Sequence, residues 1–245
     1  MTVICGINNS GKTTLIQSWM SLPPTVFQKS KEKLLEKQVL KIEQNKISDY
    51  YRCIYQCNQI NKYDLRQSDS LLEAVDWWLS EVMNLSKVSD TIGLNDGVQV
   101  FLPNVSSGIK QILLILTKCL RSQPGDTIIL EHPEIYLHPS AQSRLADFFI
   151  CMAKSKKNLI IETHSEYLIN RFLLRIAQED DAKIRELFNL LFVSFDKKLQ
   201  TSVAKPIFIN QFGEIENWPV FFFDRGDALE LMAATLKNRS SKLKQ

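Results

Sequence analysis

The stretch Gly6-Ile-Asn-Asn-Ser-Gly11-Lys12-Thr13-Thr14 follows the apolar run Thr2-Val-Ile-Cys5 and precedes a segment suited to a helix, Leu15 to Met20. It has the pattern G-x-x-x-x-G-K-T. Glycines let successive backbone N–H groups turn toward a phosphate, and the positive end of the following helix favours the same negative charge. The pattern predicts a phosphate-binding loop (P-loop) after a strand, and hence the binding of a nucleoside triphosphate.

The residues of this loop have separate expected roles. Lys12 is expected to reach the β- and γ-phosphates, and the Thr13 hydroxyl to complete the shell of a Mg²⁺ ion. The alternative is a chance match in a glycine-containing turn between a strand and a helix. The residues expected to contact the nucleotide are Asn8, Asn9, Ser10, Gly11, Lys12, Thr13 and Thr14.

The composition is that of a chain with enough apolar residues for one α/β domain: 44% of its 245 residues are hydrophobic. No apolar run reaches membrane-spanning length and no signal peptide precedes the loop, so we expect a cytoplasmic protein without membrane contact. The five cysteines are odd in number and scattered, which fits a reducing compartment. Cys53 and Cys57 are four apart, but no second pair of metal ligands accompanies them, so we interpret both as buried side chains and not as zinc ligands.

Basic residues gather in two segments. Residues 28–46 hold six lysines and three glutamates, and residues 237–245 hold four basic residues and no acid. The net charge is +3, so these contributions of +3 and +4 leave −4 on the remainder. Nucleic-acid contact is possible only in these two segments, and a solvated helix face is the commoner explanation of such charge runs.

The apolar pattern predicts alternating helices and strands. Residues 107–121 are apolar nearly all round, which indicates a buried helix, and the short apolar runs 127–130 and 159–161 indicate strands covered on both faces in a parallel sheet. Gly93 and Gly97 are expected to frame turns before the strand that follows them, and Ser68 or Asp69 is expected to cap a helix. Helices are expected at residues 15–20, 28–46, 66–86, 107–121, 139–153, 166–178 and 227–237. Strands are expected at residues 2–5, 51–57, 98–102, 127–130, 159–161, 191–195, 202–210 and 214–218.

These elements predict one α/β domain over residues 1–245 with a P-loop NTPase fold. The sheet is expected to be mostly parallel, with antiparallel strands added at its edge. A small inserted helical lobe is expected at about residues 58–104, and a C-terminal extension at about residues 190–245.

Acidic residues and histidines follow two of the predicted strands. Glu131-His132-Pro133-Glu134 comes after Leu130, and Glu162-Thr163-His164 comes after Ile161. Carboxyl ends of strands are where α/β sheets place their ligands, and His164 is positioned to contact a γ-phosphate. All three histidines of the chain, His132, His138 and His164, lie beside these strand ends, so we expect them to share a site.

The ordered motifs resemble the ATP-binding-cassette (ABC) ATPases of the SMC, RecF and OLD group. They are GINNSGKT, the lobe, VSSGIKQ, LEHPEIYLHP and IIETHSEYLI, and they span residues 2–176. INQFGEIENWP at residues 209–219 resembles the C-terminal extension of one bacterial subfamily of predicted AAA/ABC-type ATPases. The resemblance implies an ATPase head that uses ATP and Mg²⁺.

The resemblance also implies a dimer in which ATP lies between two heads. The signature residues of one subunit, Ser106, Gly108 and Gln111, would meet the γ-phosphate held by Lys12 of the other. Small residues at a helix start allow close approach to negative charge, although a Ser-Ser-Gly run before a helix is also an ordinary N-cap. Either Gln56 or Gln59 could be the glutamine that contacts Mg²⁺ in this group.

The acidic strand end departs from the pattern of the group, which has two adjacent acids there. Glu131 takes the first place, as the Mg²⁺ residue, and His132 takes the second. Glu134 is the remaining carboxylate nearby. With Glu131, His132, Glu134 and His164 as the catalytic candidates, we expect slow ATP hydrolysis. The alternative is a scaffold that senses the nucleotide without hydrolysing it. A small-molecule kinase fits poorly, because it leaves Ser106–Gln111 and Leu137–Pro139 without roles.

The resemblance implies three further expectations. A strand hairpin precedes the P-loop strand in this group and covers the adenine; here four residues separate Met1 from Gly6, so we expect a weakened base pocket or one completed by another chain. The lobe is too short for a long coiled coil. The expected partners are a second ATPase head and an effector such as a nuclease, in bacterial antiviral defence or DNA repair.

Overall fold

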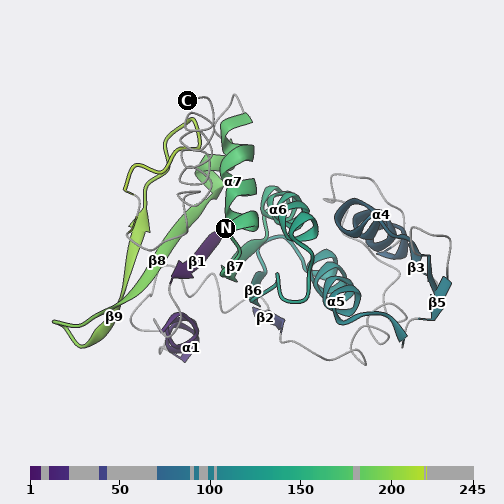
Figure 1. Ribbon diagram of the computed structural model, residues 1–245, viewed down its shortest axis with the longest axis horizontal. Helices are drawn as coiled ribbons and strands as arrows, with labels where there is room; N and C mark the ends of the chain where they lie inside the picture. The colour runs from purple at the N-terminus through teal and green to yellow at the C-terminus, as the bar shows by residue number, and fades with distance from the viewer. Residues whose placement is uncertain are drawn as a thin grey trace, which may run out of the picture.

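Strand β1 (Thr2–Gly6) lies inside a six-stranded sheet with the order β2-β6-β7-β1-β8-β9 (Figure 1). The computed structural model describes residues 1–6, 11–21, 39–42, 71–88, 91–93, 99–101, 104–178, 183–217 and 219. The first five strands in this order run parallel, and β9 is antiparallel to β8. The other strands of the sheet are β2 (Val39–Ile42), β6 (Thr127–Glu131), β7 (Asn158–Glu162), β8 (Asn189–Asp196) and β9 (Thr201–Ile207).

Helices cover both faces of this sheet. Val3, Ile128 and Ile161 belong to a large apolar core with the helices α4 to α7, whereas Ile4 and Ile129 pack with Ile16 of α1 on the other face. This alternation follows from the two-residue period of a strand. The helices are α1 (Lys12–Ser21), α4 (Leu71–Met83), α5 (Ser107–Arg121), α6 (Pro139–Lys154), α7 (Glu166–Gln178) and α8 (Lys183–Leu187).

The architecture confirms the predicted fold class, a P-loop NTPase fold with a mostly parallel sheet and an antiparallel edge. The bounds of α5 and α7 agree with the predicted helices 107–121 and 166–178. Burial of the α5 residues also agrees, because eleven of its residues are buried.

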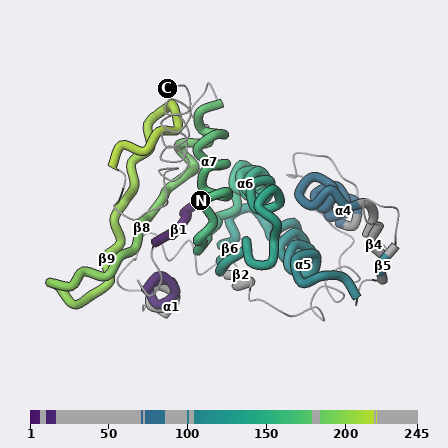
Figure 2. Tube along the Cα trace, in the orientation of Figure 1, coloured from purple at the N-terminus to yellow at the C-terminus, as the bar shows by residue number. Residues whose placement is uncertain are grey.

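The lobe contains more than the predicted helix. After α4 come the short strands β3 (Ser86–Val88), β4 (Thr91–Gly93) and β5 (Gln99–Phe101), which form a separate antiparallel sheet. Gly93 ends β4 and pairs with Gln99 of β5, which agrees with a glycine that frames the connection to the next strand. Helix α4 packs against α5 and α6, beside the main sheet (Figure 2).

Two predictions of secondary structure are wrong. Part of the helix predicted at 28–46 is strand β2, whose backbone pairs with β6 over Val39–Ile42. Hydrogen bonding to the edge of β6 outweighs the helical spacing of apolar residues in this segment. The strand predicted at 214–218 is a single bridge between Ile209 and Ile215, because the Asn210 side chain closes a tight turn by accepting bonds from the backbone N–H groups of Phe212 and Glu214.

Several predictions fall outside the described residues. They are the remainder of the helix at 28–46, the strand at 51–57, the cap at Ser68 or Asp69, the turn at Gly97, the helix at 227–237, Gln56 and Gln59, and the pair Cys53 and Cys57. Among the described cysteines, Cys5, Cys119 and Cys151 are buried and form no disulfide, and burial raises the pKa of the Cys5 and Cys119 thiols to about 12.

Ion pairs join α6 and α7, the two helices that follow strands β6 and β7. Asp147 of α6 accepts hydrogen bonds from Arg171 and Arg175 of α7, with the shortest N–O distance at 2.7 Å for each arginine. Although burial raises the pKa of Asp147, the two guanidinium groups outweigh it and lower that pKa. The helices that continue from β6 and β7 are therefore fixed to one another.

In the described parts of the chain, no helix has both the length and the apolar content to cross a membrane.

Candidate functional site

The sheet places the carboxyl end of β7 beside the P-loop strand β1 and that of β6 next to β7. Ile4 of β1 is in register with Glu162 of β7, and Glu162 is in register with Glu131 of β6. Register partners in parallel strands project from the same face, so both glutamates lie on the face of Ile4, where helix α1 packs. Glu162 lies one strand from β1 and Glu131 lies two strands from it, and adjacent strands are about 4.8 Å apart.

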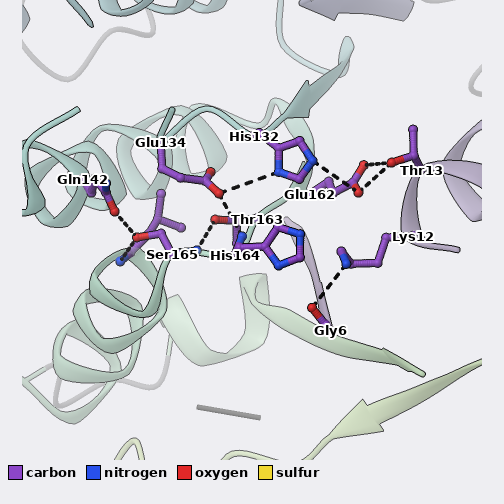
Figure 3. Close-up of polar contacts among 11 residues, drawn as sticks. Gly6, Lys12, Thr13, His132, Glu134, Gln142, Glu162, Thr163, His164 and Ser165 are labelled. Carbon is purple, nitrogen blue, oxygen red and sulfur yellow. Dashed lines mark hydrogen bonds and ion pairs between the residues drawn. The ribbon is translucent and has the colours of Figure 1, made fainter. Parts of the chain in front are cut away.

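Thr13 makes the most direct link between the P-loop and these strand ends. Its hydroxyl donates to the Glu162 carboxylate, with Oγ1 2.8 Å from Oε1 and 3.1 Å from Oε2 (Figure 3). Lys12 is 4% exposed and donates from Nζ to the Gly6 carbonyl at 3.2 Å. Burial lowers the pKa of Lys12, and the Glu162 charge partly offsets that effect. The loop lysine and threonine therefore both lie in the field of one buried carboxylate.

Glu162 is the functional candidate that sequence reasoning missed. It is 1% exposed and lies between Thr13 and His132, whose Nε2 is 3.7 Å from Oε1. A signal was available, because Glu162 follows an apolar strand as Glu131 does. The local pattern could not indicate that β7, and not β6, is the neighbour of β1.

Two histidines from the neighbouring strand ends stack on one another. The rings of His132 and His164 have centroids 5.2 Å apart and planes 8° apart. His132 has a φ of 48°, a left-handed backbone that histidine adopts more readily than most residues. Its N–H donates to the Glu162 carbonyl at 2.9 Å, which fixes the turn after β6 against β7. The predicted shared site is thus observed for His132 and His164.

Glu134 holds this histidine pair from the other side. Its Oε1 accepts from the backbone N–H of His164 at 2.8 Å and lies 3.7 Å from Nδ1 of His132. Burial of Glu134 raises its pKa, but His132 and the backbone of His164 outweigh that effect and lower the pKa. An ionised carboxylate therefore stands against both imidazoles.

The same charges separate the pKa values of the two histidines. Glu134 and Glu162 raise the pKa of His132 above its usual range, even though burial and Lys12 lower it. Burial lowers the pKa of His164, and the charges of Lys12 and His132 lower it further. His132 is therefore the more readily protonated ring of the pair, and His164 is the one that stays a neutral imidazole, with one N–H to donate, to lower pH.

The turn after His164 is anchored by hydrogen bonds to α6 and β1. Thr163 N donates to the Ile4 carbonyl at 3.0 Å, Ser165 Oγ lies 2.6 Å from Gln142 Oε1, and Ser165 caps α7 by accepting from Leu168 N at 3.1 Å. These bonds position His164 without involving its ring.

His138 and the signature residues stand apart from this group. His138 caps helix α6 through Nδ1, which accepts from Ser140 N at 3.3 Å, so the prediction that all three histidines share a site is wrong for it. Ser106 is exposed and caps α5, accepting from Ile109 N at 3.4 Å. Gly108 and Gln111 are buried, and a Cβ on Gly108 would lie 2.5 Å from the Tyr136 carbonyl oxygen. The smallness of Gly108 is therefore needed inside this chain.

The remaining nucleotide candidates are described only in part. Gly11 directly precedes α1 and its carbonyl accepts from Leu15 N at 2.8 Å, and Thr14 is exposed. Asn8, Asn9 and Ser10 lie outside the described residues.

The oxygen atoms of this group suit Mg²⁺, which prefers hard oxygen ligands and usually takes one or two carboxylates together with phosphate oxygens and water. Thr13 and Glu162 already place a hydroxyl and a carboxylate at hydrogen-bonding distance. Among the described residues, no three His, Cys, Asp or Glu side chains gather as a metal site of their own. A Mg²⁺ ion here would therefore depend on phosphate oxygens for the rest of its shell.

Residues 31–170 match the model of the family described as "AAA domain, putative AbiEii toxin, Type IV TA system". This range includes the lobe, α5 and both functional strand ends and begins after the P-loop. No curated protein matches the chain.

Solved structures share the fold at low sequence identity. The SMC head domain from Thermotoga maritima aligns with a TM-score of 0.50 and 12% identity, over 85% of this chain and 90% of that one. An SMC head bound to the C-terminal winged-helix domain of ScpA gives 0.47 and 10%, over 84% and 90%. The archaeal ABCE1 in complex with the ribosomal stalk protein aP1 gives 0.45 and 15%, over 84% and 38%. The first of these similarities supports the P-loop NTPase fold, and the other two are too weak to add to it.

Proposed function

The chain belongs to the AAA-domain family of the putative AbiEii toxins, and from this premise we propose that it binds ATP with Mg²⁺ and hydrolyses it slowly. The observation that carries the proposal is the bond between Thr13 of the P-loop and Glu162 of β7. It joins the phosphate-binding loop to a group of two carboxylates and two stacked histidines, all on neighbouring strand ends.

Two carboxylates from neighbouring strands take the place of the two adjacent acids expected along one strand. Glu131 of β6 and Glu162 of β7 are register partners on adjacent strands, and both project from the sheet face that α1 covers. We assign Thr13, Glu131 and Glu162 to the Mg²⁺ shell. Mg²⁺ supplies charge neutralisation at the phosphate oxygens when bound. His132, which occupies the sequence position of the second acid, is held between Glu134 and Glu162.

The two histidines have different proposed roles. Neutral His164 donates an N–H to an oxygen of the γ-phosphate, and Lys12 contacts the β- and γ-phosphates. His132 orients the attacking water and accepts its proton only when the imidazole is neutral. Because Glu134 and Glu162 raise the pKa of His132, this histidine stays protonated to higher pH than an ordinary imidazole does. Slow turnover follows from that charge state.

The finer partner assignments extend this proposal. A second copy of the chain would present exposed Ser106 at the start of α5, where the helix dipole favours the γ-phosphate. ATP would then hold two heads together, and hydrolysis would release them. The AbiEii family description suggests a toxin–antitoxin or defence setting in the cytoplasm, with an effector such as a nuclease controlled by the dimer.

The second candidate function is a scaffold that binds ATP without hydrolysing it. The raised pKa of His132 favours it, because a protonated imidazole cannot act as a base. The two functions differ in turnover and agree in binding.

Steady-state phosphate release separates them. We expect slow release by the wild type and at least a 100-fold lower rate for Lys12→Ala, since the loop lysine contacts the transferred phosphate. Lys154→Ala is the matched control, because this exposed lysine ends α6, about 24 Å along the helix from the strand ends. Release by His132→Glu alone would establish the scaffold and contradict the enzyme. Size-exclusion chromatography with and without non-hydrolysable ATP tests the dimer.

A further inference from the structure

The β8–β9 hairpin extends past the P-loop on the side away from β6 and β7. Gly6, the last residue of β1, is in register with Val193, while β8 continues for three more residues to Asp196. At about 3.3 Å per residue, β8 rises about 10 Å beyond the end of β1. Figure 2 shows this projection past β1, with β6 on the opposite side.

Ser202 brings the hairpin against the loop itself. A Cβ on Gly11, which has a φ of 82°, would collide with the Ser202 hydroxyl, so the Ser202 side chain points at the start of α1. Ser202 pairs directly with Phe195 across the hairpin. Directly opposed side chains share a face with their Cβ atoms about 5 Å apart, so Phe195 stands beside the contact with Gly11.

The sheet independently places Phe195 on the same face. Val193 packs with Ile4 and Ile16 on the α1 side, and Phe195 follows it by two residues. Phe195 is nevertheless 45% exposed, although a phenyl ring on the core side of a strand is ordinarily covered. The turn that ends the hairpin is fixed, because Asp196 Oδ1 accepts from Lys198 N and Leu199 N at 2.8 and 3.1 Å. An ordered aromatic ring is thus open to solvent beside the P-loop.

The chemistry of the site fixes which part of a nucleotide can reach this ring. Glu131, Glu162, His132 and His164 all come from β6 and β7, on one side of β1. A γ-phosphate must face them, so the base must extend from the loop toward the other side, where β8 and β9 lie. On that side, the exposed ring of Phe195 lies directly across the hairpin from Ser202, whose side chain reaches Gly11.

We infer that Phe195 is the surface on which the base of the nucleotide stacks, which rests on the proposed function. The β8–β9 hairpin, which follows β6 and β7 in the sequence, then supplies the surface that contacts the base, so that surface comes from the same chain as the P-loop. Stacking on a phenyl ring favours the larger face of a purine, and the ring has no polar atom with which to distinguish adenine from guanine. Phe195 therefore sets affinity for purine nucleotides in general.

Equilibrium binding of Mg²⁺-ATP and Mg²⁺-tripolyphosphate to the full chain tests this inference. Phe195→Ala is expected to weaken ATP binding by about tenfold, the size of base–aromatic stacking, and to leave tripolyphosphate binding unchanged. Phe195→Trp is expected to restore ATP affinity and to lose indole fluorescence when ATP binds. Phe212→Ala is the matched control, because Phe212 is similarly exposed but lies in the turn at Asn210–Glu214.

The inference is overturned if Phe195→Ala binds ATP as the wild type does, or if it loses ATP and tripolyphosphate equally, since the ring would then hold the loop and not the base. The proposed function survives either result. A wild type that binds neither ligand overturns the proposed function and the inference with it.

Discussion

The two sides of strand β1 differ in how they are built. On the β7 side, Glu162, Thr13 and His132 are buried or half-buried and connected by polar contacts. On the β8 side, the hairpin presents exposed Phe195 and Leu199 and approaches the loop at Gly11. Charge on one side suits the transferred phosphate, and an apolar ring on the other suits a base. The difference teaches that the two halves of the site have separate structural origins, strand ends for chemistry and a projecting hairpin for binding.

Substitution of Glu162 is expected to have the largest effect among the variants that test this difference between the two sides of β1. Glu162→Gln keeps the shape of the side chain but removes the charge beside Thr13 and His132. We expect turnover to fall on the order of 100-fold, the loss typical of removing one preorganised group, with ATP affinity changing far less. Phosphate release and equilibrium binding, measured on the same variant, separate the two effects.

Glu186→Gln is the control for Glu162→Gln, because Glu186 is an exposed acid on α8. Unchanged turnover in Glu162→Gln would show that the Glu162 charge has no role in ATP hydrolysis. A parallel loss of turnover and ATP affinity would make it a binding residue only.

The pH dependence of turnover sharpens the comparison with a smaller effect. Glu134 and Glu162 raise the pKa of His132, while burial and the charge of Lys12 act against them. If neutral His132 accepts the proton, turnover must rise with pH through a pKa above 6.5 and fall by about tenfold for each unit below it.

Two variants check the origin of this pH profile. His132→Gln should have a flat profile over the same range. Phe195→Ala should keep the wild-type profile at saturating ATP, because residues 189–207, which include the hairpin, contain no histidine. A wild-type rate that does not change between pH 6 and 8.5 would exclude His132 as the proton acceptor.

Local patterns were sufficient for much of the fold. Helix α5 is apolar on nearly every side and helix α7 follows Ser165, so their bounds could be predicted from the sequence. Strand β2 could not, because its conformation depends on pairing with β6, which lies more than eighty residues away in sequence. The hairpin β3–β4 was missed because its strands have only three residues each, too few for a periodic signal.

The same distinction applies to the site. The loop motif indicated Lys12 and Thr13, and the acid and histidine after β6 could be recognised as candidates. Glu162 was missed because its importance depends on the order of the strands, which brings β7 and not β6 beside β1. His138 was assigned wrongly because proximity in sequence to a strand end does not determine where its ring points, and its Nδ1 caps α6 instead.

Calorimetric titration of ATP into the wild type and Lys12→Ala, with Mg²⁺ and with a chelator, tests the central claim most directly. We predict one ATP bound per chain and no binding by Lys12→Ala at the same concentrations. We also predict an affinity at least tenfold lower without Mg²⁺, since Thr13 and Glu162 would hold the ion and the ion would neutralise phosphate charge. Absence of binding by the wild type, or equal binding by the wild type and Lys12→Ala, would contradict the claim that this loop and the neighbouring strand ends form an ATP site.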